Sequence, residues 1–205
     1  MPGQPLRPAD FEGALESGDP RLAFCDDLAL ARRTIAAFES DDPAQLALRE
    51  EMLAFLDAHP EDAHRRTQLA GHLTAAALVL DAACERALLT HHRKLGRWLQ
   101  LGGHLDGDAN LAAGALREAS EESGVVGLRL LPDPIDLDVH PIPARPGEPE
   151  HLHLDVRFVA IAPPGAREVV SDESHALGWF RPEELAGAGV DDSVRRLFRA
   201  VFGRG

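Results

Sequence analysis

The stretch from Gly102 to Gly124 constrains the fold of this chain more than any other part of the sequence. The pair Gly102-Gly103 predicts a turn, and a capped helix is predicted from about Asn110 to Glu122, with Gly124 just beyond its end. One side of this helix is apolar, so it can be buried against a sheet. The apolar residues that recur at helical spacing are Leu111, Ala112, Ala115, Leu116 and Ala119.

The same helix carries Glu118, Glu121 and Glu122, whose i, i+3 and i+4 spacing predicts that three carboxylates point to one face. Like charges at this spacing repel one another, so a cation would stabilise them. Mg²⁺ or Mn²⁺ is the natural candidate because hard cations prefer oxygen ligands. The alternative is an acidic face that is simply hydrated, and the spacing alone leaves both interpretations open.

The N-terminal third of the chain favours helices. They are expected over residues 11–15, 20–38 and 43–58, the last beginning after Asp42-Pro43 and ending at His59-Pro60. We therefore predict a helical N-terminal extension over residues 1–68, followed by a main domain over residues 69–205. The extension carries no catalytic spacing, so its expected role is packing or the formation of a homodimer.

The main domain alternates short apolar runs with turns. Strands are predicted at 73–80, 86–90, 98–101, 128–131, 135–140, 151–161 and 178–180, and a closing helix at 191–202. The first two strands form a hairpin around residues 81–85, while residues 142–149 form a proline-rich loop. Strands with helices before, between and after them predict an α/β or α+β sandwich.

Charge and composition disfavour several classes of protein. With 34 acidic and 21 basic residues, the net charge of −13 disfavours a nucleic-acid coat protein or a polybasic membrane binder. No run approaches the ~18 apolar residues of a membrane span. The N-terminus lacks the basic start and apolar core of a secretory signal. Two cysteines without CxxC spacing are typical of a reducing compartment, so we expect a cytoplasmic protein.

The residues from Gly103 to Val125 resemble the Nudix box, which is a glycine, five residues, Glu, seven residues, and then Arg-Glu-apolar-x-Glu-Glu-x-Gly-apolar. The early Glu of that pattern falls on Ala109, and we expect Asp108 to take over its pairing with Arg117. On this interpretation Ala109→Glu is neutral or slightly stabilising. The second half of the box is matched in register by Arg117, Glu118, Ala119, Ser120, Glu121, Glu122, Ser123, Gly124 and Val125.

The resemblance implies a Nudix-type α/β/α sandwich with a mixed sheet. It also implies hydrolysis of a diphosphate bond in a nucleoside diphosphate linked to another moiety, with Mg²⁺ or Mn²⁺ as the cofactor. The implied metal ligands are the carbonyl oxygen of Gly102 and the carboxylates of Glu118, Glu121 and Glu122. The general base stays open among Glu118, Glu121 and Glu173.

Four side chains are candidates for contacts with an anionic small-molecule substrate. Arg93 and Arg97 belong to a basic cluster just before the glycine turn and could receive a phosphate, although solvated hairpin charges are an equal alternative. His104 follows the glycine turn and is either a cleft residue or a turn residue. Arg157 lies on a strand with period-two polar residues and is expected to contact the substrate.

That strand also carries histidines. His151 and His153 share a face with Asp155, and a zinc site with His140 is one interpretation, although the spacing matches no known ligand signature. A polar strand that lines the substrate cleft is the favoured interpretation.

Two rival functions remain open. Removal of a pyrophosphate from capped RNA is disfavoured by the acidic balance, because a strand-binding groove needs a basic track. A catalytically silent Nudix-fold nucleotide-binding sensor or interaction module is the other rival, since fold alone does not fix function.

Overall fold

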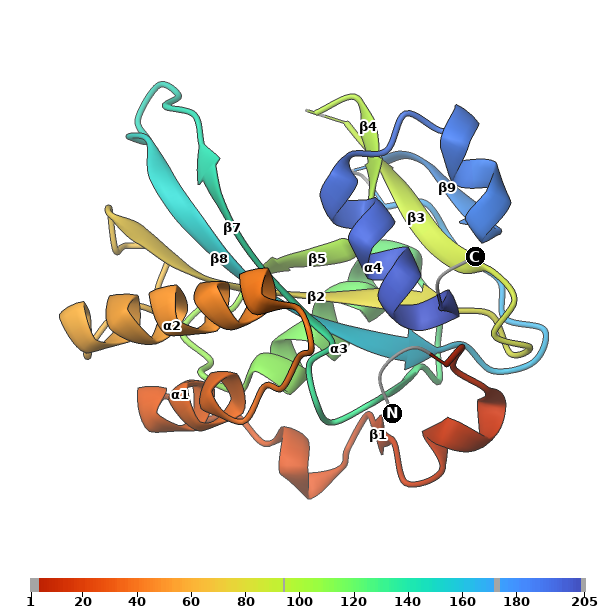
Figure 1. Ribbon diagram of the computed structural model, residues 1–205, viewed down its shortest axis with the longest axis horizontal. Coiled ribbons are helices and arrows are strands. Elements are labelled where there is room, and N and C mark those ends of the chain that lie inside the picture. Colours follow the sequence, from red (N-terminus) through yellow and green to blue (C-terminus); the bar gives the residue numbers. More distant parts are fainter. Residues whose placement is uncertain (1–3, 94, 172–173, 204–205) are drawn as a thin grey trace.

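A computed structural model describes residues 4–93, 95–171 and 174–203 (Figure 1). Its helices are α1 (Leu28–Ala36), α2 (Pro43–Ala58), α3 (Leu111–Ser123) and α4 (Asp192–Phe202). Its strands are β1 (Leu15–Glu16), β2 (Gly71–Leu80), β3 (Ala87–His92), β4 (Arg97–Leu99), β5 (Leu101–His104), β6 (Arg129–Leu130), β7 (Asp136–Ile142), β8 (His151–Ile161) and β9 (Ser174–Phe180). Short 3-10 helices occupy Pro8–Phe11, Pro20–Leu22 and Pro182–Gly187.

The centre of the fold is the parallel pair β2 and β8, which keeps one register from Gly71 opposite Leu152 to Leu80 opposite Ile161. The path of the sheet is β1-β6-β8-β2-β3-β4, while β5 pairs antiparallel with β2, β7 with β8 and β9 with β3. A mixed sheet with helices on both faces confirms the predicted sandwich. Because parallel neighbours are covered on both faces, every residue of β2 is buried.

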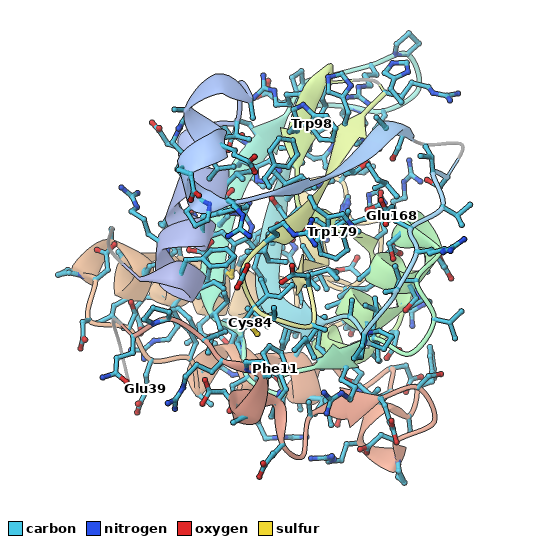
Figure 2. All side chains as sticks on the ribbon, turned by 90° about the vertical axis from the view of Figure 1, so that its right-hand side faces the viewer. Phe11, Glu39, Cys84, Trp98, Glu168 and Trp179 are labelled. Carbon is cyan, nitrogen blue, oxygen red and sulfur yellow. The ribbon has the colours of Figure 1, made fainter. Side chains whose placement is uncertain are left out.

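The side chains of the sheet alternate between two cores. Leu73, Ala75 and Ala77 of β2 join the core that α1, α2 and α3 cover. Leu78 and Leu80 join a second core with Val194 and other residues of α4. Phe11 and Cys84 belong to this second core and lie near each other in Figure 2. The period-two alternation of the strands therefore separates the α3 side of the sheet from the α4 side.

The N-terminal segment is less helical than its sequence predicts. Residues 43–58 form the predicted helix, whereas the helix predicted over 20–38 begins only at Leu28, where Asp27 caps it by accepting a hydrogen bond from Ala29 N. The short helix predicted over 11–15 is wrong, because Pro8–Phe11 is a 3-10 turn and Leu15–Glu16 is a strand paired with β6. Local apolar spacing could not anticipate this pairing with a distant strand.

The main domain follows the prediction more closely. The hairpin, α3, β8 and α4 are confirmed within a few residues, but the strand predicted over 98–101 is two strands, β4 and β5, that pair with β3 and β2 respectively. The turn predicted at Gly102-Gly103 is wrong, because both glycines lie within β5 and pair with Ala76 and Ala75 of β2. The last strand begins at Ser174 and is longer than the predicted 178–180. Over the described ranges, no helix is long and apolar enough to cross a membrane.

The N-terminal segment shares its core with the sheet. Ile35 and Met52 are fully buried in the same cluster as Leu73 and Ala75 of β2. Packing is thus a role of α1 and α2 in this structure, and homodimer formation remains a prediction.

We expect Ile35→Ala to lower the free energy of unfolding of the whole protein by about 2–5 kcal/mol, because it leaves a cavity in the shared core. Denaturant unfolding followed by circular dichroism should show one cooperative transition shifted to lower denaturant. Phe24→Ala is the matched control, since Phe24 is 69% exposed in the same segment and should change stability by no more than about 0.5 kcal/mol. A separate early transition in Ile35→Ala would show that the segment unfolds alone.

Candidate active site

Helix α3 is held at both ends. The side-chain oxygen of Asn110 accepts a hydrogen bond from Ala113 N at 3.3 Å, which caps the N-terminus. At the other end Gly124 is left-handed with φ of 65°, and a Cβ there would lie 2.8 Å from that of Val169. The helix packs its apolar side on β2 and β5, so its acidic residues are presented from a rigid element.

Arg117 joins two of the three glutamates. Its Nη1 lies 2.6 Å from Glu118 Oε1 and 3.5 Å from Glu121 Oε2, and its Nη2 donates to the carbonyl oxygen of His104 at 2.7 Å. Glu118 is mostly buried, while Glu121 is mostly exposed. Burial raises the pKa of Glu118, the charges of Glu121 and Asp106 raise it further, and Arg117 opposes this shift.

The strand β5 fits closely against these carboxylates. Glu122 is buried and its Oε2 accepts a hydrogen bond from Gly102 N at 2.9 Å. A Cβ added at Gly103 would lie 2.5 Å from Glu118 Oε2, so only glycine allows this approach. The predicted common face is therefore divided: Glu118 and Glu121 share Arg117, and Glu122 turns to the backbone of β5.

The donor set suits a hard divalent cation, since it consists of carboxylate oxygens beside the glycines of β5. Part of the favourable charge is supplied by Arg117, which contacts the two carboxylates that a cation would also bind. Among the described residues, the three glutamates do not bring one oxygen each within 4.8 Å of the others, so a cation bound by all of them requires at least one of these side chains to change its conformation.

Arg93 and Arg97 lie on the exposed β3–β4 hairpin. Arg93 Nη2 donates to Ser174 O at 3.3 Å, and Arg97 Nη1 lies 3.6 Å from Asp191 Oδ2 at the start of α4. Both guanidinium groups keep surface available to a ligand at this hairpin. The prediction for Glu173 lies outside the described residues.

The NUDIX domain family matches residues 71–200, which is more than half of the chain. The chain belongs to the NUDIX family. This confirms the family resemblance of the acidic helix, and the protein is a pyrophosphohydrolase by enzyme class. No curated protein gives a significant match.

Solved Nudix structures share the fold at low sequence identity. A hydrolase of the NUDIX family from Clostridium perfringens is 22% identical with a TM-score of 0.51, covering 64% of this chain and 95% of its own. An Ap4A hydrolase from C. elegans is 16% identical with a TM-score of 0.52, covering 62% and 93%. A MutT NUDIX hydrolase from Burkholderia pseudomallei is 24% identical with a TM-score of 0.50, covering 64% and 98%.

The Nudix box of this chain departs from the expected pairing. Asp108 does not pair with Arg117; its Oδ1 accepts hydrogen bonds from Cys25 N at 3.0 Å and from Asn110 N at 2.9 Å. Asp108 is drawn away from Arg117 because the N-terminal segment passes over this turn. Ala109 N donates to Cys25 O, and Ala109 is fully buried in the core.

The expectation that Arg157 contacts the substrate is also wrong. Arg157 is 2% exposed, and its guanidinium is shared by Asp136 at 3.2 Å, Asp138 at 3.1 Å and Asp155 at 2.7 Å. Ser193 Oγ of α4 accepts a further hydrogen bond at 2.9 Å. Each nitrogen of its guanidinium group has a protein partner, so Arg157 joins β7, β8 and α4 rather than meeting a ligand.

A second arginine completes this buried network. Arg196 of α4 donates to Asp136 at 2.7 Å and to Asp138 at 2.8 Å. Although burial opposes ionisation of Asp138, hydrogen bonds from His140 and Arg196 and the charge of Arg157 hold its pKa below the ordinary value. No local pattern in the sequence predicts this arrangement, because it requires β7 and β8 to pair with Asp138 opposite Asp155.

Histidines occupy the remainder of the same sheet face. His104 lies there, with its ring 5.0 Å from that of His72 and 5.2 Å from that of His153. His72 was not among the residues predicted for the site. Its only sequence signal is its position at the start of a strand, and register alone places it opposite His153.

We expect Arg157→Ala to lower the free energy of unfolding by about 3–5 kcal/mol, since it leaves buried carboxylates without their partner. Urea unfolding is the measurement. The control Arg32→Ala removes an exposed ion pair with Asp57 and should change stability by no more than about 0.5 kcal/mol. A stable Arg157→Ala protein with only a raised KM would restore Arg157 as a substrate contact.

We expect Ala109→Glu to destabilise the protein by at least about 3 kcal/mol, contrary to the neutral effect predicted from the Nudix pattern. The larger, charged side chain enters a fully buried position beneath Cys25. Thermal melts of Ala109→Glu and of Ala112→Glu separate burial from added charge, because Ala112 is a half-buried position in the first turn of α3. An unchanged melting temperature in Ala109→Glu would mean that the N-terminal segment moves away from residue 109 at little cost in free energy.

Proposed function

We propose that this Nudix protein is a Mg²⁺- or Mn²⁺-dependent hydrolase that cleaves a diphosphate bond in a nucleoside diphosphate linked to another moiety. The observation that carries the proposal is the acidic half of the box, held complete on a capped and buried helix against the glycines of β5. A nucleotide-binding sensor has no need of all three carboxylates, which repel one another.

The proposed metal ligands are Glu118, Glu121 and Glu122, with the carbonyl oxygen of Gly102 as a fourth. A divalent cation here would lower the pKa of bound water and neutralise charge on the phosphates. The residues themselves provide the platform: Gly103 admits Glu118, Gly102 N orients Glu122, and Arg117 holds Glu118 and Glu121 close.

The proton of the attacking water requires a carboxylate acceptor. Glu118 and Glu121 are the candidates within the described helix, and Glu173 remains a candidate from the sequence. Burial and neighbouring negative charge already favour protonation of Glu118, so this side chain readily accepts a proton when the site is free of metal.

The substrate is proposed to be a small nucleotide. Arg93 and Arg97 are exposed cations on the β3–β4 hairpin and are our proposed contacts to phosphate. A net charge of −13 makes a nucleic-acid strand an unsuitable partner. Since one of the similar structures is an Ap4A hydrolase, dinucleoside polyphosphates belong among the substrates to be tested.

The first experiment compares products from nucleoside diphosphate sugars, dinucleoside polyphosphates, ADP-ribose and nucleoside triphosphates, with and without Mg²⁺. Phosphorus-resolved product analysis identifies which bond breaks. Metal-dependent cleavage of one class supports the proposal and names the substrate. Nucleotide binding without cleavage of any member would favour the sensor.

We expect Glu121→Gln to abolish most turnover while the fold stays intact. The side chain is largely exposed, so the change removes charge from the proposed metal site without disturbing packing. A loss of several kcal/mol of transition-state stabilisation corresponds to a decrease in kcat of about 100-fold or more. The control is Glu51→Gln, an exposed glutamate of α2. Full activity of Glu121→Gln would contradict the assignment of this carboxylate to the metal.

A further inference from the structure

A cluster of imidazole rings lies at one end of the sheet, away from the face that α3 covers. The pairing of β2 with β5 sets Thr74 opposite His104, and the pairing of β2 with β8 sets His72 opposite His153. The ring centroids of His72, His104 and His153 are 4.9–5.2 Å apart. His151 extends the cluster, 4.9 Å from His72.

The three rings are close enough to share one ion. One nitrogen from each of His72, His104 and His153 lies within 4.8 Å of the other two, and within the described ranges no other three histidine, cysteine or acidic side chains meet this spacing. Tetrahedral zinc with bonds of 2.0–2.1 Å places its nitrogen ligands about 3.3 Å apart. The rings therefore need to converge by no more than about 1.5 Å.

The cluster holds buried nitrogens without partners in the described structure. Nε2 of His72, His104 and His151 is buried and makes no hydrogen bond there. His72 is 2% exposed, so its unpaired nitrogen is unfavourable unless something else binds it. Its Nδ1 lies 3.5 Å from Gln68 O, and Nδ1 of His151 lies 2.9 Å from Pro149 O. A proton held on Nδ1 by a carbonyl leaves a lone pair on Nε2, which is the form that binds metals.

Burial disfavours the charged form of His153. Burial and the neighbouring histidines His72, His104, His140 and His151 together lower the pKa of His153 to about 2. Burial also lowers the pKa of His72. Neutral imidazoles cannot attract phosphate by charge, but they are good ligands for a borderline transition metal.

We propose that His72, His104 and His153 form a transition-metal site of the zinc class, separate from the carboxylate site on α3. Three protein ligands leave one coordination position open for water or a ligand group. A recess of about 370 Å³ is lined by Arg66, Leu69, Pro146, Gly147, Glu148 and Pro149. The carbonyl oxygen of Pro149 lies 2.9 Å from Nδ1 of His151, so the recess borders the histidine cluster.

The geometry of β5 separates the two sites. Adjacent residues of a strand point to opposite faces, so Gly103 meets Glu118 on the α3 side while the side chain of His104 lies on the other side with His72. Ligand chemistry separates them too, since imidazole favours zinc-class ions and carboxylates favour Mg²⁺. The proposal thus stands independently of the hydrolase activity.

The test uses the full chain without a polyhistidine tag, stripped of metal and supplied with excess Mg²⁺ to fill oxygen sites. Zn²⁺ is titrated in competition with a chromophoric chelator, and Co²⁺ is added separately to record its visible ligand-field spectrum. We expect about one Zn²⁺ per chain bound at sub-micromolar concentration, and intense Co²⁺ bands typical of four-coordinate nitrogen ligation.

The variants His104→Ala and His153→Ala should each weaken Zn²⁺ binding by about 100-fold or more, since even the loss of a group behind a ligand weakens binding by about 10–100-fold. His175→Ala removes an exposed histidine outside the cluster and should bind Zn²⁺ normally. Glu121→Gln should also retain Zn²⁺, whatever happens to its turnover, which distinguishes failure of this proposal from failure of the proposed function.

Two results would overturn the proposal. One is equal Zn²⁺ affinity in wild type and in both cluster variants. The other is a wild-type protein that is folded by thermal melt but binds no Zn²⁺ and gives Co²⁺ only the weak bands of six-coordinate oxygen ligation. The second result is read from the wild type alone, so it overturns the proposal even where a variant folds poorly.

Discussion

The parallel ladder between β2 and β8 is the constraint on which the rest of the structure depends. Its register runs from Gly71 opposite Leu152 to Leu80 opposite Ile161. Because side chains alternate, a slip of one residue would move Leu73 and the other apolar residues to the α4 side and the histidines into the α3 core. Both cores enforce the same register. β5 then pairs with β2, which brings Gly102 and Gly103 of β5 against the glutamates of α3.

The α4 side of this ladder changes character along its length. Beneath α4 it is apolar; next come Arg157 and its carboxylates, and the outer end carries the histidines. Burying Arg157 requires that every charge be matched, and the carboxylates of β7 and β8 together with Ser193 of α4 accomplish this. A buried network of this kind determines how β7, β8 and α4 pack together more than it adds to the free energy of unfolding. Beyond the part of this face that α4 covers, the imidazole rings are able to bind a ligand.

Local signals predicted the elements, but not the contacts between them. Helix α3 was predictable because its cap, its apolar spacing and Gly124 all agree. Arg157 was misjudged because a strand of alternating polar residues indicates exposure, whereas β7 and α4 cover this one. The residue pattern of a single strand cannot predict the histidine cluster, because His72, His104 and His153 come from three strands and meet only through the sheet register. The roles of the glutamates remain proposals based on family and geometry.

The N-terminal segment explains why Ala109 stands where the Nudix pattern has a glutamate. In the Nudix pattern a glutamate at this position would pair with the arginine of the box, whereas here Arg117 binds Glu118, Glu121 and the carbonyl of His104. The turn is secured by the N-terminal segment instead: Asp108 and Ala109 both bond the backbone of Cys25, and Asn110 donates to the carbonyls of Arg21 and Ala23. A small residue at 109 is what allows that segment to lie so close. Packing from outside the family domain thus takes the place of an ion pair within it, and it ties the N-terminal segment to the turn that precedes α3.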